Sequence, residues 1–197
     1  MHATKFLGVH IDDSVNFKCH IDHLVNKLSK YIGLFYKIRH FLPLSALLTL
    51  YKTLFEPHLN YCNVIWCNTF TSHLTKLVSL QKKVIRALSW SEINSPTHPL
   101  FHRFQLLRLA ELNVYHNACL MFQIVNRLNP RLSSLVPISS PQHTYPTRTK
   151  SQISGKLRRH VRTSMSVVCR GPQIWNRIDD GLKVLPSISN FKKQLKK

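Results

Sequence analysis

A regular stripe of large apolar side chains over residues 17–42 constrains the fold of this chain more than any other feature. Eight of them recur at alternating intervals of four and three residues. They are Phe17, Ile21, Leu24, Leu28, Tyr31, Phe35, Ile38 and Leu42. This spacing places all eight on one face of an α-helix. Because proline interrupts a helix, the stripe predicts one long helix of about 25 residues that ends before Pro43.

Shorter apolar faces after this stripe predict several more helices. Pro43 suits the first position of a second helix, and Pro57 breaks or restarts that helix. Thr71 or Ser72 can cap the next helix, because a hydroxyl oxygen accepts a hydrogen bond from an unpaired backbone N–H group. The predicted helical segments after the first are residues 43–55, 57–66, 71–88 and 108–128.

Both ends of the chain carry patterns other than these helices. Residues 4–11 alternate around a short apolar run and end at two aspartates, which predicts a short strand or hairpin followed by a turn. The segment SMSVVCRGPQIW, residues 164–175, predicts a further short strand before Gly171 and Pro172. Ser189 or Asn190 can cap a short closing helix.

The predicted fold class is mostly α, a helical bundle with a short N-terminal β-strand or hairpin and a small basic C-terminal extension. Residues 133–149 hold three prolines among serines and threonines, which is typical of a linker. The predicted divisions are a strand and turn over residues 1–16, a helical domain over 17–132, the linker over 133–149 and a basic region over 150–197.

The chain is strongly basic, with 28 Lys and Arg residues against 8 Asp and Glu residues and a formal net charge of +20. Such an imbalance favours polyanionic partners, with nucleic acid ahead of an anionic membrane. Residues 101–197 carry a net +14 of this charge. Tyr145 and Trp175 are the only aromatic residues near the basic C-terminal region that could stack on bases. We therefore predict contact with phosphates rather than with bases. The candidate nucleic-acid-binding residues are Lys76, Lys82, Lys83, Arg86, Lys156, Arg158, Arg159, Arg162 and Arg170.

The eight carboxylates argue against several classes of enzyme. A two-metal polymerase or nuclease needs several carboxylates that converge from separate elements, whereas these acids form two adjacent pairs and four single residues. No G-x-S-x-G motif frames a serine. We therefore predict that the chain has no enzymatic activity on its own.

Cysteine usage and hydropathy predict an intracellular protein. The five cysteines are an odd number and follow no signal peptide, so we expect reduced thiols. The apolar runs are far shorter than the ~20 residues that a membrane-spanning helix needs. We expect no membrane partner and a place in a nuclear or cytoplasmic ribonucleoprotein.

Two groups of residues have side chains of the types that bind metals. They are Cys19, His20 and His23, and His58, Cys62 and Cys67. Neither group has the two tight pairs, separated by a dozen residues, that a structural zinc site usually shows. Cys62 and Cys67 lie among apolar residues, which is typical of buried thiols. His20 and Asp22 match the first half of the iron-binding triad of oxygenases, but they stand at the start of a helix, where Asp22 suits the helix dipole. We predict no metal and no cofactor.

Four sequence blocks follow one another in a distinctive order: KFLGVHID, FKCHIDHLVNKLSKYIGLFYKIRHFLP, LLTLYKTLFEPHLNYCNVIWCNT and LVSLQKKVIRALSW. Together they resemble the region just after the palm of non-LTR retrotransposon reverse transcriptases, most closely the jockey and CR1-like group. The later segments HTYPTR, RGPQIWNRI and SNFKKQLKK are similar to the C-terminal end of the same reading frames. The resemblance extends over nearly the whole chain.

This resemblance implies a role in holding nucleic acid. Residues 17–90 match the thumb, which holds the template–primer duplex, and the first block matches the primer grip, which positions the 3′ end of the primer. The primer-grip match comprises Lys5, Phe6, Leu7 and Gly8. The fingers and the palm with its catalytic aspartates would lie before Met1, and the pair Asp12-Asp13 does not match those aspartates. We therefore expect a non-catalytic fragment of an RNA-directed DNA polymerase, with RNA, DNA or hybrid duplex and the missing palm and fingers as partners.

Two alternatives belong to other functional classes. One is a helical protein-interaction module whose charge is incidental. The other rests on residues 20–39, which are similar to a helical segment labelled as the N-terminal part of alkylation-repair dioxygenase homologues. No dioxygenase or methyltransferase core accompanies that segment, so we prefer the nucleic-acid-binding interpretation.

Overall fold

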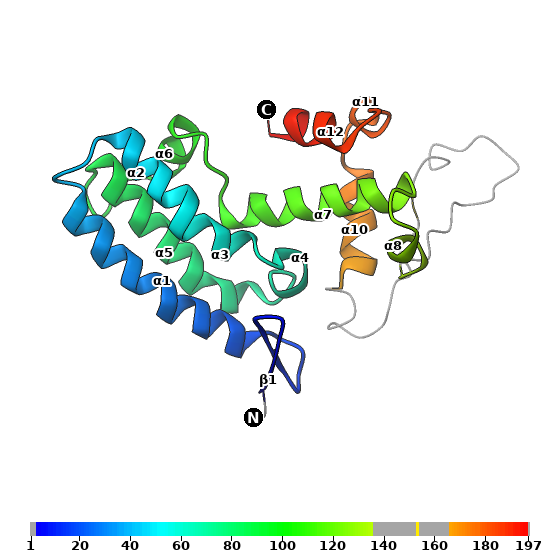
Figure 1. Ribbon diagram of the computed structural model, residues 1–197, viewed down its shortest axis with the longest axis horizontal. Helices are drawn as coiled ribbons and strands as arrows, with labels where there is room; N and C mark the ends of the chain where they lie inside the picture. The colour runs from blue at the N-terminus through cyan, green and yellow to red at the C-terminus, as the bar shows by residue number, and fades with distance from the viewer. Residues whose placement is uncertain (1–2, 136–152, 154–165, 197) are drawn as a thin grey trace, which may run out of the picture. The chain divides into compact units, whose positions relative to one another are not determined.

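The computed structural model describes residues 3–135, 153 and 166–196. Helices predominate there, together with one two-stranded antiparallel sheet, so the predicted mostly α class with an N-terminal hairpin is confirmed (Figure 1). The chain forms two compact units, residues 1–112 and 113–197, which divide within helix α7 (Leu109–Val125). The predicted linker over residues 133–149 lies almost entirely outside the described residues and stays a prediction.

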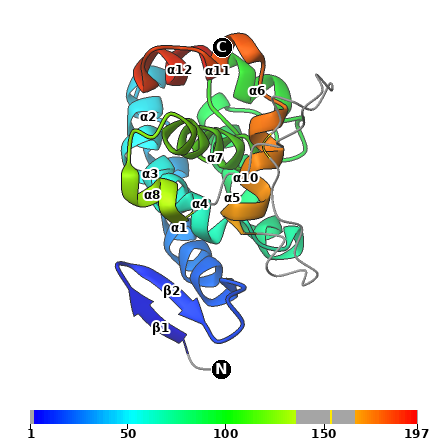
Figure 2. The same cartoon turned by 90° about the vertical axis from the view of Figure 1, so that its right-hand side faces the viewer.

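Strands β1 (Ala3–Phe6) and β2 (Val9–Asp12) pair as an antiparallel hairpin (Figure 2). The two-residue turn between them has positive φ at both positions, 45° at Leu7 and 82° at Gly8, as a type I′ turn requires. Glycine adopts this conformation easily, whereas leucine adopts it at a cost in energy. The alternating pattern at the start of the sequence therefore forms two short strands rather than one.

The long helices of the first unit follow the predicted order. Its elements are α1 (Lys18–Ile38), α2 (Leu44–Leu50), the π-helical turn η1 (Tyr51–Phe55), α3 (Glu56–Asn60), α4 (Asn63–Trp66), α5 (Thr71–Ser89) and α6 (His98–Arg103). Helices α1 and α5 pack side by side and run in the same direction, and α2, η1 and α3 form a rod that returns beside them (Figure 1). Asp22 and Lys76 meet near the start of α1 and α5, whereas Arg39 and Trp90 meet beyond their ends.

The apolar stripe on α1 lies in the hydrophobic core of the first unit, which we call the first core, as predicted. Its buried members are Ile21, Leu24, Leu28 and Phe35, with Phe17 just before the helix. They pack with the apolar faces of α5 and of the α2–α3 rod. The helix ends at Ile38 rather than at Leu42. Because the residue before a proline disfavours helical backbone, the chain leaves the helix ahead of Pro43.

A π-helical turn joins α2 to α3 at the point where the sequence predicted an interruption. The N–H of Glu56 donates a hydrogen bond to the carbonyl of Tyr51, five residues earlier. Pro57 has no N–H with which to continue the regular helical ladder, and the wider turn carries the chain past it. Pro57 therefore restarts the helix as α3 and does not end it.

The second unit contains most of α7 together with shorter helices. These are α8 (Pro130–Leu135), α10 (Val167–Asn176), α11 (Asp180–Lys183) and α12 (Ile188–Leu195). Its core centres on three aromatic rings: the ring centroids of Phe122 and Phe191 are 4.5 Å apart, and those of Phe122 and Trp175 are 6.3 Å apart. The side-chain amide of Asn176 exchanges two hydrogen bonds of 3.0 Å with the backbone of Ile153.

The short strand predicted before Gly171 and Pro172 is wrong, because helix α10 begins at Val167 and continues through both of these residues. Cys169, Pro172 and Trp175 are buried and recur every three residues, a helical spacing that faces the core. The valines at its start favour strands, but the packing of this face decides the backbone conformation. At Gly171, an added Cβ would lie 2.6 Å from Sδ of Met121 on α7, so the two helices approach closely there.

Other local expectations need smaller corrections. Helix α5 begins at Thr71, after Phe70, without a side-chain cap, whereas the cap of α12 is Ser187, whose Oγ accepts the N–H of Asn190 at 3.2 Å. Helices α6 and α8 were not predicted, because six residues are too few to show a helical period. None of the described helices combines the length and the hydropathy that would let it cross a membrane.

Candidate nucleic-acid interface

Helix α1 carries a second stripe, made of basic residues, on a face that the core does not use. We call it the basic stripe, and it comprises His23, Lys27, Lys30 and Lys37. All four side chains are exposed, and their spacing keeps them on one side of the helix. From the first to the last of them the helix rises about 21 Å, at roughly 1.5 Å per residue.

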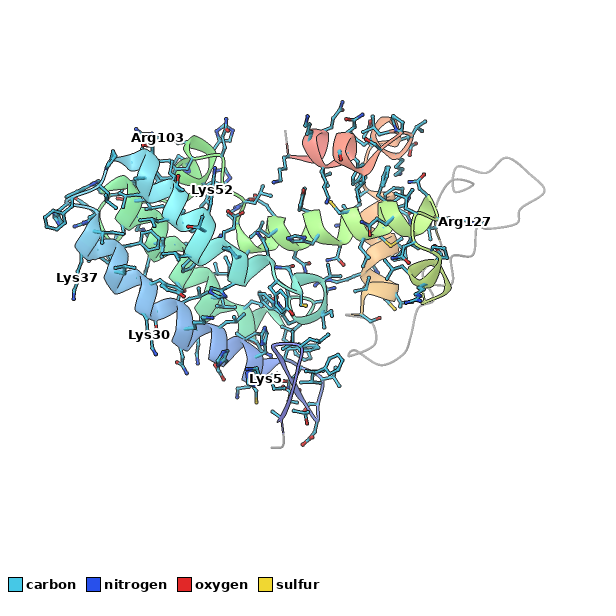
Figure 3. The ribbon with its side chains drawn as sticks, in the orientation of Figure 1. Lys5, Lys30, Lys37, Lys52, Arg103 and Arg127 are labelled. Carbon is cyan, nitrogen blue, oxygen red and sulfur yellow. The ribbon has the colours of Figure 1, made fainter. Side chains whose placement is uncertain are left out.

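Lys5 of strand β1 continues the basic stripe beyond the start of α1. Figure 3 shows Lys5, Lys30 and Lys37 in a row along the outer edge of the hairpin and α1. The pKa of His23 is lowered, first by burial and then by the positive charges of His10, Lys27 and Lys5. Because the charged groups that act on this imidazole are all cations, the potential along this edge is positive and attracts anions.

Helix α3 adds an imidazole ring to the same edge. The ring of His58 stacks on that of Tyr31, with centroids 6.0 Å apart. Burial lowers the pKa of His58, and the charges of Lys27 and His23 lower it further. The hairpin and α1 therefore each contribute cations to one side of the first unit, whereas the lowered pKa keeps the His58 ring of α3 neutral near pH 7.

Helix α5 carries the four nucleic-acid-binding residues predicted before residue 100, and they differ in their surroundings. Lys82 and Lys83 are exposed, and no carboxylate in the described part of the chain pairs with them. Nζ of Lys76 lies 3.5 Å from Oδ1 of Asp22 on α1. Nε of the half-buried Arg86 donates a hydrogen bond to the carbonyl of Ser95. Two of the four therefore already have protein partners, which reduces what they offer to a phosphate.

The C-terminal candidates are only partly described. Lys156, Arg158, Arg159 and Arg162 lie outside the described residues, so phosphate binding by this group stays a prediction. Arg170 is half-buried on α10 in the second unit. In the same unit, burial lowers the pKa of His116, and the charges of Lys192 and Lys196 on or next to α12 lower it further. The second unit therefore also carries a region of positive potential.

The four residues predicted as a primer grip form the closed end of the hairpin. Lys5 is exposed, and the side chains of Phe6 and Leu7 are 63% and 73% exposed, which is unusual for large apolar groups. Tyr61 supports the turn: its hydroxyl donates a hydrogen bond to the Leu7 carbonyl at 2.5 Å, and its ring lies 3.6 Å from the place of a Cβ on Gly8. Tyr61 therefore fixes the backbone of the turn, while the apolar side chains of Phe6 and Leu7 remain exposed to solvent.

The buried carboxylate of Asp12 fixes the hairpin to the start of α1. Its Oδ1 accepts the N–H of Asn16 at 2.8 Å, and its Oδ2 accepts the N–H of Lys18 at 3.1 Å. Lys18 is the first residue of α1, and Phe17 before it supplies no capping group. Asp12 therefore takes the place of a helix cap, and its charge suits the positive end of the helix dipole.

In the part of the chain that the structure describes, no group of His, Cys, Asp or Glu residues is arranged to hold a metal ion. His20 is buried, and its ring centroid lies 5.6 Å from that of Trp66. Burial is the main reason why the pKa of His20 is lowered to about 4. Cys67 is buried in the first core, as predicted, and Cys62 packs against that core half-buried.

Part of this chain is similar to a known polymerase. Over 103 residues, 49% of the chain, it is 30% identical to the probable RNA-directed DNA polymerase from transposon X-element of Drosophila melanogaster. The similarity supports a segment related to reverse transcriptases. The matched part covers 11% of that polymerase. No protein-family model matches the chain, and no solved structure does either.

The basic stripe was not among the predicted nucleic-acid-binding residues, although the sequence held a signal for it. Residues 23, 27, 30, 34 and 37 recur at the same alternating intervals of four and three as the apolar stripe, on a neighbouring face of α1. Four of these five positions are basic, and Leu34 is the exception. A charge count over whole segments favours the C-terminal half and does not reveal a face of this kind.

Proposed function

We propose that this chain is the nucleic-acid-binding segment of a retrotransposon reverse transcriptase and that it holds template–primer or element RNA through phosphates. The observation that carries the proposal is the basic stripe, continued by Lys5, on an edge where no described carboxylate pairs with its lysines. The partial similarity to a transposon RNA-directed DNA polymerase supports the same conclusion.

The dimensions of the basic stripe suit a nucleic-acid backbone. Its rise of about 21 Å corresponds to about six base pairs at roughly 3.4 Å per nucleotide of one strand. Exposed lysines bind phosphates as mobile point charges and do not read bases, so the contact would be independent of sequence. Such a contact is what a segment needs if it holds any template that passes through the enzyme.

Within this proposal, residues 17–90 act as a thumb and the hairpin as a primer grip, of the jockey and CR1-like group. Catalysis would belong to the palm and fingers, and this chain would be non-catalytic by itself. The exposed side chains of Phe6 and Leu7 give the hairpin an apolar surface that suits contact with those partners. The proposed location is an intracellular ribonucleoprotein, nuclear or cytoplasmic.

A salt titration of duplex binding tests the proposal. Each phosphate contact on duplex DNA contributes about 0.9 to the slope of log affinity against log salt concentration. Changing Lys27, Lys30 and Lys37 together to alanine should therefore reduce the slope by up to about 2.7 units and weaken binding to all sequences alike. An unchanged slope would contradict the assignment of the basic stripe.

A matched control removes the same charge elsewhere. Lys52, Lys192 and Lys193 are exposed and lie outside the basic stripe, and they can be changed together to alanine. The control should leave most of the slope intact. Equal losses in the two triple variants would mean that net charge alone attracts the nucleic acid. Binding of a protein partner that does not respond to salt, without any nucleic-acid binding, would instead favour a protein-interaction module.

A further inference from the structure

Aromatic and basic side chains gather where α1 and α5 end, opposite to the hairpin end of these two helices. The guanidinium carbon of Arg39 lies 4.5 Å from the ring centroid of Trp90 and 4.9 Å from that of Tyr36. The ring of His40 meets Trp90 edge to face, with centroids 4.7 Å apart. Trp90 nevertheless stays 56% exposed, so a large part of its ring is open to a ligand.

A cavity of about 180 Å³ opens beside the Trp90 ring. We call it the Trp90 pocket, and its lining residues are Leu44, Leu47, Leu88, Ser89, Trp90, Arg103 and Phe104. Five of these seven residues have apolar or aromatic side chains, and Ser89 and Arg103 supply polar groups. The volume is below the roughly 300–1,000 Å³ of pockets for drug-sized ligands. It therefore suits one planar ring system rather than a whole nucleotide.

The backbone at Trp90 has a strained, left-handed conformation. Trp90 has a φ of 57°, in the left-handed region, at the end of α5. Its N–H and that of Ser91 both donate to the carbonyl of Arg86, as in the usual glycine-terminated helix end. Glycine is favoured here, and a bulky residue is a clear exception. Strained residues of this kind cluster at functional sites.

The charge around the Trp90 pocket favours an anionic ligand. Neither Arg39 nor Arg103 forms an ion pair with any carboxylate of the described residues, and the buried Nε of Arg39 has no hydrogen-bond partner there. Lys37 is exposed two residues before Arg39. Glu92 is the nearest carboxylate in sequence, and it is exposed in the loop after α5. Cations therefore outnumber acids around an open aromatic ring.

We propose that the Trp90 pocket binds an unpaired base of single-stranded nucleic acid. The base would stack on Trp90 and enter the cavity, while Arg39 and Arg103 hold the phosphates on either side of it. This inference rests on the proposed function for the choice of nucleic acid, and it adds a site that recognises a base to the basic stripe, which holds the backbone. A base of a duplex cannot enter the pocket, because it is paired and stacked inside the duplex.

Tryptophan fluorescence of the full chain tests the site directly. Of the three tryptophans, Trp66 and Trp175 are 0% and 3% exposed, so a bound base can stack on Trp90 alone. The probes are an eight-nucleotide oligouridylate, an abasic oligonucleotide of the same length and an eight-base-pair RNA duplex. The oligouridylate should quench the emission, whereas the abasic strand and the duplex should bind without quenching.

The variant Trp90→Gly removes the ring at a position where glycine is the favoured residue, so the variant should fold. It should lose the quenching and bind oligouridylate about 5- to 150-fold more weakly, the usual range for one base–aromatic stack. The salt dependence of duplex binding should not change. Ile93→Ala is the matched control, because Ile93 is also apolar, 80% exposed and close to Trp90 in sequence, but does not line the pocket.

Three kinds of result would overturn the inference. Oligouridylate binding without quenching, or with equal affinity for Trp90→Gly and wild type, would remove the base site and leave the basic stripe and the proposed function intact. Quenching by an apolar peptide but not by oligouridylate would identify the pocket as a protein-docking site. If no probe bound at any salt concentration, both the proposed function and the base site would be wrong.

Discussion

Gln81 on α5 donates a hydrogen bond of 3.0 Å from its side-chain amide to the hydroxyl oxygen of Tyr51 on η1, inside the first core. The same amide nitrogen donates to the carbonyl of Leu107, and the amide oxygen accepts the N–H of Leu109 at 2.9 Å. One buried side chain therefore joins α5 to the π-helical turn and to the start of α7. Burial raises the pKa of Tyr51 well above its ordinary value, which keeps this phenol neutral.

We expect Gln81→Leu to destabilise the protein by roughly 3 kcal/mol. The substitution keeps an apolar core but removes the partner of three buried polar groups, and each buried group left unsatisfied costs about 1–3 kcal/mol. Tyr51→Phe should cost only about 1 kcal/mol, because Gln81 keeps its other two bonds. Urea denaturation of both variants measures the two values. Similar stability of Gln81→Leu and wild type would show that the network does not hold these elements together.

Leu28→Ala should destabilise the first unit by about 2–5 kcal/mol, the usual cost of a cavity left by a buried leucine. Leu28 is 0% exposed at the centre of the apolar stripe. Leu34→Ala on the same helix is the control: Leu34 is 39% exposed, so its truncation should change stability by less than about 0.5 kcal/mol. Chemical denaturation of the pair decides this, and equal effects would mean that the stripe is not a core stripe.

Acid should destabilise the protein through His20. The pKa of His20 is lowered from 6.5 to about 4, mainly by burial. Between these two values the unfolded chain takes up a proton that the folded protein does not, so stability is lost as the pH falls through this range. A pKa that is lowered by one unit corresponds to about 1.4 kcal/mol of stability. Because solvent screens part of this effect, we expect a total loss of about 2 kcal/mol.

The comparison of wild type with His20→Gln isolates this contribution. Glutamine does not titrate and can still accept the hydrogen bond that the backbone N–H of His10 donates to the ring of His20 at 3.4 Å. The rest of the chain is the same in both proteins, so the difference between them reports on the side chain at position 20. Urea denaturation at pH 7 and at pH 4.5 should show a smaller loss for His20→Gln than for wild type. Equal losses would show that His20 does not control the acid response.

Gly171→Ala should destabilise the second unit, whereas Gly33→Ala should stabilise the first. An alanine Cβ at position 171 would meet Sδ of Met121 at 2.6 Å, so α10 or the methionine must move, at a cost of about 1–3 kcal/mol. At position 33 on α1 nothing lies within 4 Å of the added Cβ, and alanine favours helix over glycine by about 1 kcal/mol. Thermal denaturation of the two variants should give shifts of opposite sign. A stabilised Gly171→Ala variant would show that α10 and α7 are not in close contact there.

The candidate site could be predicted only in part. The basic residues of α1 follow from the sequence, because a helical period of 3.6 residues fixes which side chains share a face. The predicted lysines of α5 are where the sequence placed them, but the ion pair of Lys76 with Asp22 depends on how α1 and α5 pack. The Trp90 pocket was missed for the same reason, since Arg39 and Trp90 belong to different helices and meet only in the folded unit.

The sequence by itself determined the long helices of the first unit, the N-terminal hairpin and the excess of positive charge. These features depend on local periodicity, turn chemistry and composition, which neighbouring residues specify without help from the rest of the chain. The tertiary structure decided whether residues 167–176 form a strand or a helix. It also decided which of the predicted lysines pair with a carboxylate and which polar groups are buried together. Those outcomes depend on contacts between residues far apart in the sequence, and a contact of that kind can outweigh the preference of any single residue for helix or strand.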